Sequence, residues 1–398
     1  MLLDNGNLGS MAMTIYIAAI VVVLLLGLLM KPNSTKKRKR EYMIIVFTIV
    51  ILISALRKYT VGKDLAGHYY NTFLRIRNLP WNVALNVTSY EKGYVGFYKI
   101  VGAIFNDPQW MIVIHSFFVF GIIGWFIYKN SEDVVLSVSL FILCNIWFME
   151  MTMMRQAMAV SMGLVATEIW KHTEWKTRRY VLFGLTVLPA VSFHSTGIVI
   201  AVFPLFEYLP FKRKSIFWTS LALMIVFVLY DYVYKFMAGI ISFTRDYKDF
   251  YEGTEYGTAS INLFALYELF IAVFCFALAY WIMVYRSGSP RVTKMENINK
   301  IDEDNLVLND NYLMYMVLLL VMCRMLRLRI YIITRMAYYF IPFIWILYPR
   351  AIKNMKGASN RFIVRVFIYT LFIVIFLIIG YKKAGDYYGT VPYVFFWR

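Results

Sequence analysis

Long unbroken apolar runs constrain this chain more than any other feature, for example Ile15 to Met30 and Phe367 to Gly380. In lipid, every backbone polar group must be hydrogen-bonded within the protein, so only helices or closed barrels span a membrane. Barrel strands alternate apolar and polar residues over about ten positions, whereas these runs do not alternate. The runs therefore predict an all-α, polytopic membrane protein.

The composition also indicates lipid as the surrounding solvent. Of 398 residues, 61% are hydrophobic and 16% are charged, whereas soluble domains are about half apolar and about a quarter charged. In a soluble protein, the net charge of +18 would suggest nucleic acid binding. Here many of the basic residues lie in short loops, where Lys and Arg set membrane topology. We therefore expect the lipid bilayer as a partner and no nucleic acid.

A bilayer core about 30 Å thick needs about 20 apolar residues per helix, and fewer where flanking side chains snorkel. We expect one integral membrane domain over residues 1–398, with about twelve membrane segments. These segments are 12–30, 42–56, 110–128, 134–150, 152–170, 180–192, 194–209, 215–234, 261–285, 312–327, 331–349 and 362–381. Residues 95–105 are too few to span, so we expect a re-entrant or interfacial helix there. Pro189 and the polar step at His194 leave either one kinked span or two half-length helices over 180–209.

The basic loops predict the orientation. Residues 31–41 carry the densest Lys/Arg cluster and are therefore expected in the cytoplasm. Alternation then places further basic loops inside, namely 171–179, 210–214, 286–310 and 350–361. The loops 57–109 and 235–260 and the tail 382–398 would face the exterior. This agreement favours a hairpin over 180–209, because a single span would place 210–214 outside.

Arginines near one membrane rim are the first candidate functional residues. Arginine at mid-bilayer costs at least about 2.5 kcal/mol and is by default a functional hypothesis. Arg324 and Arg327 are three residues apart and share a helix face, and Arg335 begins the next apolar run. Guanidinium pairs bidentately with phosphate oxygens. The three arginines therefore predict a diphosphate site, and snorkelling at a helix end is the alternative.

Further candidates lie at helix ends and breaks. Arg57 and Arg155 are additional diphosphate candidates, for which helix-end or snorkelling roles are the alternative. Gly62 permits a turn after Arg57, and Asp64 can cap the helix that follows. His194 lies at a helix break and ordinarily titrates near neutrality, which suits proton transfer. A packed core histidine is the alternative there.

Tyr and Trp are abundant in the expected exterior segments. Aromatic residues favour membrane interfaces for structural reasons, but a sugar ring also presents an apolar C–H face that stacks on them.

Nucleotide-binding loops and metal-ligand spacings are absent from the sequence. We therefore expect neither a cofactor nor a metal.

Taken in order, these motifs resemble the EpsG family of membrane proteins. The resemblance covers roughly residues 50–345, and the order of its short motifs on a multi-span scaffold is moderately specific. It rests on Arg57 with Val61-Gly62-Lys63-Asp64, Tyr70 and Phe73, on Glu91-Lys92-Gly93-Tyr94, on Arg155-Gln156-Ala157, on Phe193-His194-Ser195, and on Arg335 with Tyr338-Tyr339-Phe340.

The family is similar to Wzy-type polymerases of exopolysaccharide, capsule and O-antigen assembly, and the resemblance implies a fold similar to GT-C-type glycosyltransferases. It implies an enzyme of the bacterial cytoplasmic membrane whose active site faces the exterior or periplasm. The donor would be a glycan on undecaprenyl diphosphate, and the acceptor would be an incoming lipid-linked oligosaccharide repeat unit. A flippase and a chain-length regulator of the same pathway are expected partners.

The expected reaction is attack of an acceptor hydroxyl on the donor anomeric carbon, with lipid diphosphate as leaving group. It needs a base and positive charge at the diphosphate. We expect His194 or Asp64 as the base, with His194 ahead. The residues expected to hold sugar are Tyr69, Tyr70, Glu91, Tyr94 and Gln156. A lipid-linked oligosaccharide flippase, a membrane O-acyltransferase and a non-catalytic scaffold are the alternatives, and the gathering of arginines near one rim favours the enzyme.

Overall fold

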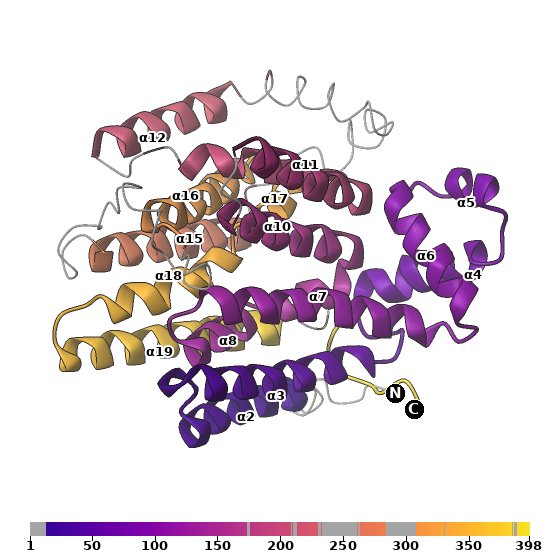
Figure 1. Cartoon of the computed structure of the whole chain (residues 1–398), viewed down its shortest axis with the longest axis horizontal. Coiled ribbons are helices and arrows are strands. Elements are labelled where there is room, and N and C mark those ends of the chain that lie inside the picture. The colour runs from indigo at the N-terminus through magenta and orange to yellow at the C-terminus, as the bar shows by residue number, and fades with distance from the viewer. Residues whose placement is uncertain are drawn as a thin grey trace. The chain divides into compact units, whose positions relative to one another are not determined.

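The fold is helical throughout the part of the chain that the structure, a computed structural model, describes (Figure 1). The described residues are 13–172, 176–207, 209, 213–229, 232, 261, 263–283, 308–329, 331–383, 385 and 388–398. Every named element within them is a helix, and an isolated antiparallel bridge joins Arg57 to Phe395. This confirms the prediction of an all-α protein. The expected loop 235–260 and nearly all of 286–310 lie outside the described residues.

Every membrane segment expected from the sequence overlaps at least one helix. The α-helices are α2 Thr14–Met30, α3 Lys36–Ala55, α4 Tyr70–Ile76, α5 Trp81–Val87, α6 Lys92–Ile104, α7 Gln109–Asn130, α8 Val134–Leu143, α9 Ile146–Thr152, α10 Met154–His172, α11 Lys176–Phe193, α12 Arg213–Val228, α15 Leu263–Trp281, α16 Asp310–Leu326, α17 Thr334–Ala337, α18 Pro342–Lys353 and α19 Ala358–Lys383. The 3₁₀ helices are η1 Pro32–Ser34, η3 Ser195–Glu207 and η7 Tyr331–Ile333, and η2 Leu65–Tyr69 is a π-helix.

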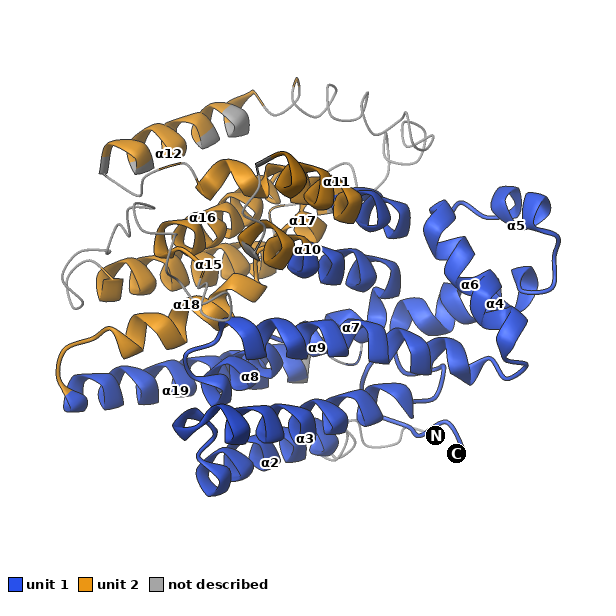
Figure 2. Ribbon diagram, in the orientation of Figure 1, with its two compact units in different colours: residues 1–165, 188–197, 358–398 blue, residues 166–187, 198–357 orange. Residues whose placement is uncertain are grey.

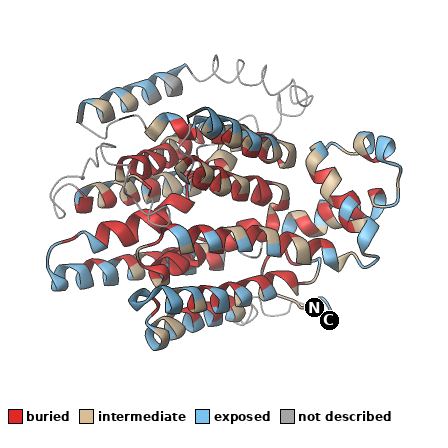
Figure 3. Cartoon of the chain, in the orientation of Figure 1, coloured by how far each residue is buried: buried red, intermediate tan, exposed pale blue. Residues whose placement is uncertain are grey.

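Several helices carry exposed residues (Figure 3). Many of these residues are large and apolar, which indicates a lipid-facing surface. Among the described residues, α7, α15 and the Ala358–Gly380 part of α19 are each long and apolar enough to cross a membrane. The pair α8 and α9, bent by 57°, is a fourth candidate. Leu29 on α2 is 79% exposed and Leu263 on α15 is 85% exposed. Such surfaces mark membrane contact, so the helices belong to a membrane protein.

The chain divides into two compact units (Figure 2). Unit 1 comprises Met1–Val165, Leu188–Gly197 and Ala358–Arg398, and unit 2 comprises Ala166–Val187 and Ile198–Gly357. In unit 1, α3 packs on α2 and α7, and in unit 2, α15 packs on α16 and α18. Each unit contains its own group of candidate site residues.

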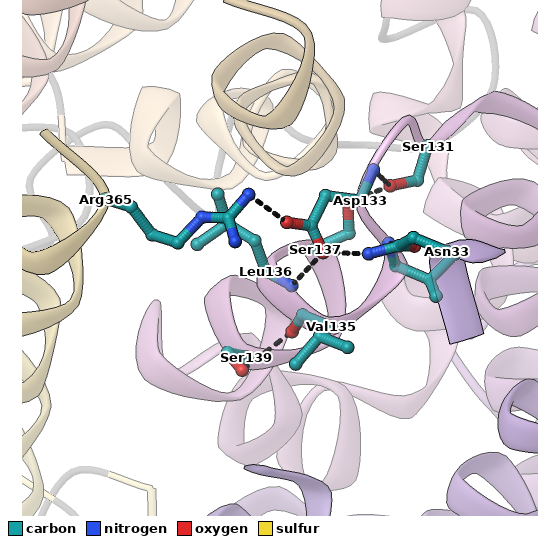
Figure 4. Close-up of polar contacts among 9 residues, drawn as sticks. Asn33, Ser131, Asp133, Val135, Leu136, Ser137, Ser139 and Arg365 are labelled. Atoms are coloured by element: carbon teal, nitrogen blue, oxygen red, sulfur yellow. Dashed lines mark hydrogen bonds and ion pairs between the residues drawn. The ribbon is translucent and has the colours of Figure 1, made fainter. Parts of the chain in front are cut away.

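Asp133 joins three parts of unit 1 (Figure 4). Its carboxylate caps α8 by accepting a hydrogen bond from the Leu136 backbone N–H at 3.3 Å. It also accepts one from Asn33 Nδ2 at 2.8 Å and pairs with Arg365 Nη2 at 2.7 Å. Negative charge is favourable at a helix N-terminus. Because Asn33 lies between α2 and α3 and Arg365 lies on α19, one carboxylate ties these helices to α8.

Residues 388–398 form a strap along residues 56–63, called here the C-terminal strap. Backbone hydrogen bonds run from Lys58 N to the Val394 carbonyl at 2.8 Å and from Gly62 N to the Gly389 carbonyl at 2.7 Å. Gly62 has φ 118°, which only glycine adopts easily, so the predicted turn is present. The Thr152 hydroxyl donates to the Tyr388 carbonyl at 2.6 Å. The strap therefore holds the loop that leads into η2.

Candidate functional site

Arg57 is enclosed within unit 1. Its side chain is 0% exposed. Its Nη1 donates to the Ser54 carbonyl and to Ser116 Oγ at 3.3 Å, and its Nη2 donates to the Met151 carbonyl at 3.2 Å. Three protein oxygens thus accept hydrogen bonds from the guanidinium, which favours a structural role for Arg57. We leave Arg57 out of the proposed diphosphate site.

At the helix break beside His194, the backbone binds a carboxylate that is distant in the sequence. α11 ends at Phe193 and η3 begins at Ser195, so 180–209 forms two helices with Pro189 inside the first. A helix start leaves backbone N–H groups without partners in the helix. The Ser195 N–H donates to Glu91 Oε1 at 3.1 Å. Glu91 precedes α6 without capping it, and its carboxylate serves this second helix instead.

Gly93 permits the close approach of α6 to the end of α11. A Cβ at Gly93 would lie 2.2 Å from Ser192 Oγ and 2.8 Å from the Ser192 carbonyl oxygen. Any larger residue would push the start of α6 away from α11. The glycine in the Glu91-Lys92-Gly93-Tyr94 motif therefore lets α6 lie close enough to α11 for the Glu91 carboxylate to bind the Ser195 N–H.

Arg155 completes this arrangement from the first turn of α10. Its Nη1 lies 2.5 Å from Glu91 Oε2, and both side chains are 12% exposed. The guanidinium lies over the Tyr90 ring, 4.3 Å from its centroid, and 5.9 Å from that of Tyr69. One arginine and one carboxylate balance each other, and the aromatic faces support the cation.

Four tyrosines, Tyr69, Tyr90, Tyr94 and Tyr98, form a cluster beside this ion pair, which we call the tyrosine cluster. Neighbouring ring centroids are 4.7 to 6.3 Å apart, and the Tyr98 hydroxyl donates to the Tyr69 carbonyl at 3.0 Å. Burial raises the pKa of Tyr69 to about 12, with Arg155 opposing this and the Asp64 charge adding to it. Tyr69 is therefore a neutral hydrogen-bond donor at physiological pH, and Asp64 lies close enough to influence it.

The other residues of unit 1 that the sequence predicted for the site differ in their burial and contacts. Asp64 precedes η2, is half-buried, and makes no cap with its side chain. Gln156 is buried next to Arg155 on α10. Tyr70 stacks on Tyr59 with centroids 4.3 Å apart and planes 18° apart. Because successive helix residues point about 100° apart, Tyr70 faces away from its neighbour Tyr69.

His194 is buried at the break, and its ring is held by Thr196. Its Nδ1 accepts the Thr196 backbone N–H at 3.2 Å and lies 2.8 Å from Thr196 Oγ1. His194 directly precedes Ser195, the residue bound by Glu91. Unit 1 thus brings together Glu91, Arg155, the tyrosine cluster and the His194 segment.

Unit 2 brings Arg324 and Arg327 together on one acid, Glu268 of α15. Glu268 Oε1 lies 3.1 Å from Arg324 Nη1, and Oε2 pairs with Arg327 Nη1. Arg324 lies 5.8 Å from the Tyr338 ring centroid, and Arg327 lies 5.6 Å from that of Tyr331. The two guanidinium groups and one carboxylate together carry one net positive charge.

Arg335 is half-buried on α17, three residues before the Tyr338 that Arg324 contacts. Glu268 pairs with both arginines and is a site residue that the sequence analysis above did not name as a candidate. A lone acid inside an apolar run, opposite two rim arginines, is the signal that could have found it. Tyr90, Tyr98 and Thr196 had no comparable signal. Within the described residues, no three His, Cys, Asp or Glu side chains gather as a metal site requires.

Buried ion pairs within helices that expose apolar faces define a polytopic membrane protein with charged sites in its interior. The chain belongs to the EpsG family, whose model matches residues 41–395. This match confirms the resemblance and supports a polysaccharide polymerase role in general. No curated protein matches the chain, and no solved structure does.

Proposed function

We propose that this protein is a membrane glycosyltransferase that joins lipid-diphosphate-linked oligosaccharide repeat units into a surface polysaccharide. The observation that carries the proposal is that Arg324 and Arg327 share one acid, Glu268, within the part of the chain that the structure describes. A guanidinium has five N–H donors, so a diphosphate can bind the pair while Glu268 still orients it. The net positive charge, largely shielded from water, favours an anionic ligand such as a diphosphate.

Unit 1 supplies groups suited to sugar. Of the tyrosine cluster, Tyr90 is half-buried and can offer its ring to the C–H face of a sugar, while the buried Tyr69, Tyr94 and Tyr98 support it. Glu91, Arg155 and Gln156 offer polar groups for hydroxyls. Arg155, whose charge Glu91 balances, is left out of the proposed diphosphate site.

The proposed reaction forms a bond between the acceptor oxygen and the donor anomeric carbon. The bond from that carbon to the diphosphate oxygen breaks, and the lipid diphosphate leaves with the electron pair. The hydroxyl proton passes to a base, for which His194 and Asp64 are the candidates. We propose that this occurs at the exterior or periplasmic face of the cytoplasmic membrane, beside a flippase and a chain-length regulator.

The test is polymerisation by the purified protein. The host's own lipid-diphosphate repeat unit is supplied without nucleotide or metal, and the products are separated on a gel. A ladder of increasing repeats is expected. Intact protein without a ladder would contradict the proposal, and leaflet transfer of the same lipid in liposomes would then identify a flippase.

Arg324→Lys provides the matched variant. Lysine keeps the charge but loses the bidentate fork, so KM for the lipid donor should rise about tenfold. Arg350→Lys is the control, because Arg350 is also buried and pairs with Asp310 at the other end of α16. If both variants change KM equally, Arg324 does not bind the diphosphate.

A further inference from the structure

The hydrogen bonds around His194 determine which of its ring nitrogens carries the proton. A backbone N–H only donates, so the Thr196 N–H that points at His194 Nδ1 requires a lone pair there. The Thr196 hydroxyl lies 2.8 Å from the same nitrogen and can donate to it as well. A neutral imidazole has one N–H. Its proton is therefore on Nε2, and protonating Nδ1 would set two N–H groups against each other.

We propose that Thr196 holds His194 in the Nε2–H form, and that His194 donates a hydrogen bond to a substrate oxygen instead of acting as the base. This rests on the proposed function. A base must present a lone pair to the acceptor hydroxyl. In His194, the lone pair of Nδ1 faces Thr196, and Nε2 already holds the proton. This proposal gives His194 a different role from the one that the sequence favoured.

The base then falls to Asp64. Asp64 is half-buried and directly precedes η2, the helix that ends at Tyr69, and its charge adds to the rise in the pKa of Tyr69 and of Tyr90. In the transfer step, the hydroxyl proton moves to the Asp64 carboxylate as the new carbon–oxygen bond forms. The His194 Nε2–H stays on the ring, and its hydrogen bond strengthens as negative charge grows on the substrate oxygen that it contacts. Every proton and electron pair is accounted for without a further reactant.

Two substitutions separate the donor from the base. In His194→Gln, the side-chain amide nitrogen occupies roughly the place of Nε2 and donates, but it cannot take a proton. In His194→Asn, the shorter amide reaches only the place of Nδ1. As a donor, His194 predicts that the Gln variant keeps activity within about tenfold of wild type, while the Asn variant falls at least about 100-fold. If the Gln variant is as inactive as the Asn variant, the donor role is wrong and His194 is again the candidate base. If both variants are fully active, His194 has only a packing role.

Thr196 is a positioning residue, and nitrogen NMR of labelled histidine reads its effect directly. The chain has four histidines, so the His194 signals are those missing from the His194→Gln spectrum. We expect an unprotonated Nδ1 and a protonated Nε2 in wild type and in Thr196→Ser, which keeps the hydroxyl. Thr196→Val keeps the backbone N–H but loses the hydroxyl, so its His194 Nδ1 should stay unprotonated but shift toward the signal of a less hydrogen-bonded nitrogen, and the transfer rate should be several-fold lower. A proton on Nδ1 in wild type would overturn the proposal.

The two hypotheses fail separately. Wild-type protein that makes no ladder contradicts the polymerase, whatever the tautomer. A wild-type ladder together with equal loss in His194→Gln and His194→Asn contradicts only the donor role.

Discussion

The two units use arginine in opposite ways. In unit 1, Arg155 has one carboxylate, and the second oxygen of that carboxylate accepts a backbone N–H from Ser195. In unit 2, one carboxylate, Glu268, serves both Arg324 and Arg327. The first arrangement is neutral and joins α6, α10 and η3, whereas the second keeps a positive charge. Charge balance, more than the presence of arginine, therefore distinguishes a group that positions the chain from one suited to an anion.

Removing each acid should give the largest effect and the sharpest contrast. Breaking a buried pair at one partner costs about 3–5 kcal/mol, so Glu91→Gln and Glu268→Gln should both lower Tm. Undecaprenyl diphosphate should raise Tm more in Glu268→Gln than in wild type, because a ligand that binds the folded state stabilises it. The measurement is Tm in detergent with and without the lipid.

Glu91→Gln provides the comparison within the same assay. Its ligand-induced rise in Tm should equal that of wild type, because the neutral pair of unit 1 is not the proposed diphosphate site. The comparison breaks if Glu91→Gln enlarges the response to the lipid and Glu268→Gln does not.

Aromatic support should differ between the units by a smaller amount. Arg155 is 4.3 Å from the Tyr90 centroid, whereas Arg327 is 5.6 Å from that of Tyr331. Shielded cation–π contacts contribute up to about 2 kcal/mol. We therefore expect Tyr90→Leu to lower the free energy of unfolding by about 2 kcal/mol and Tyr331→Leu by less than about 1 kcal/mol. Tyr90→Phe keeps the ring and should stay near wild type; a loss as large as in Tyr90→Leu would assign the effect to the hydroxyl.

The smallest effect is a pH dependence that belongs to unit 1. Burial raises the pKa of Tyr69 from 10.0 to about 12. Below pH 10 both the folded and the unfolded states keep this proton, so it gives no pH dependence. Above about pH 10 the unfolded state ionises first, and stability falls by about 1.4 kcal/mol by about pH 11. Unfolding of Tyr69→Phe across this range should lack that part of the decline, and identical curves would contradict the burial of the hydroxyl.

The helices were predictable because their signals are local. Apolar runs and the polar step at His194 lie within single segments, and the break appears where the sequence places it. The ion pairs were not predictable, since Glu91 is 64 residues from Arg155 and 104 residues from Ser195. Only packing, with Gly93 against Ser192, brings them together.

Side-chain direction was equally beyond the sequence. Tyr70 faces Tyr59, while Tyr90, which matched no motif, faces Arg155. Arg57 belongs to the family motif, yet its contacts are all with the protein's own oxygens. A motif specifies a residue type, and the type alone does not show whether the residue binds a substrate or stabilises the fold.

The C-terminal strap imposes an order on biogenesis. The ribosome makes residues 56–63 long before residues 388–398, yet the two segments are bonded to each other. In the nascent chain, the loop before η2 therefore lacks its hydrogen bonds to the strap while every later helix enters the membrane. Fastening needs residues 388–398 on the same side of the bilayer as that loop. A chain with one helix inserted wrongly would leave the strap on the opposite side, so the strap makes correct insertion of the whole chain a condition for an ordered loop before η2.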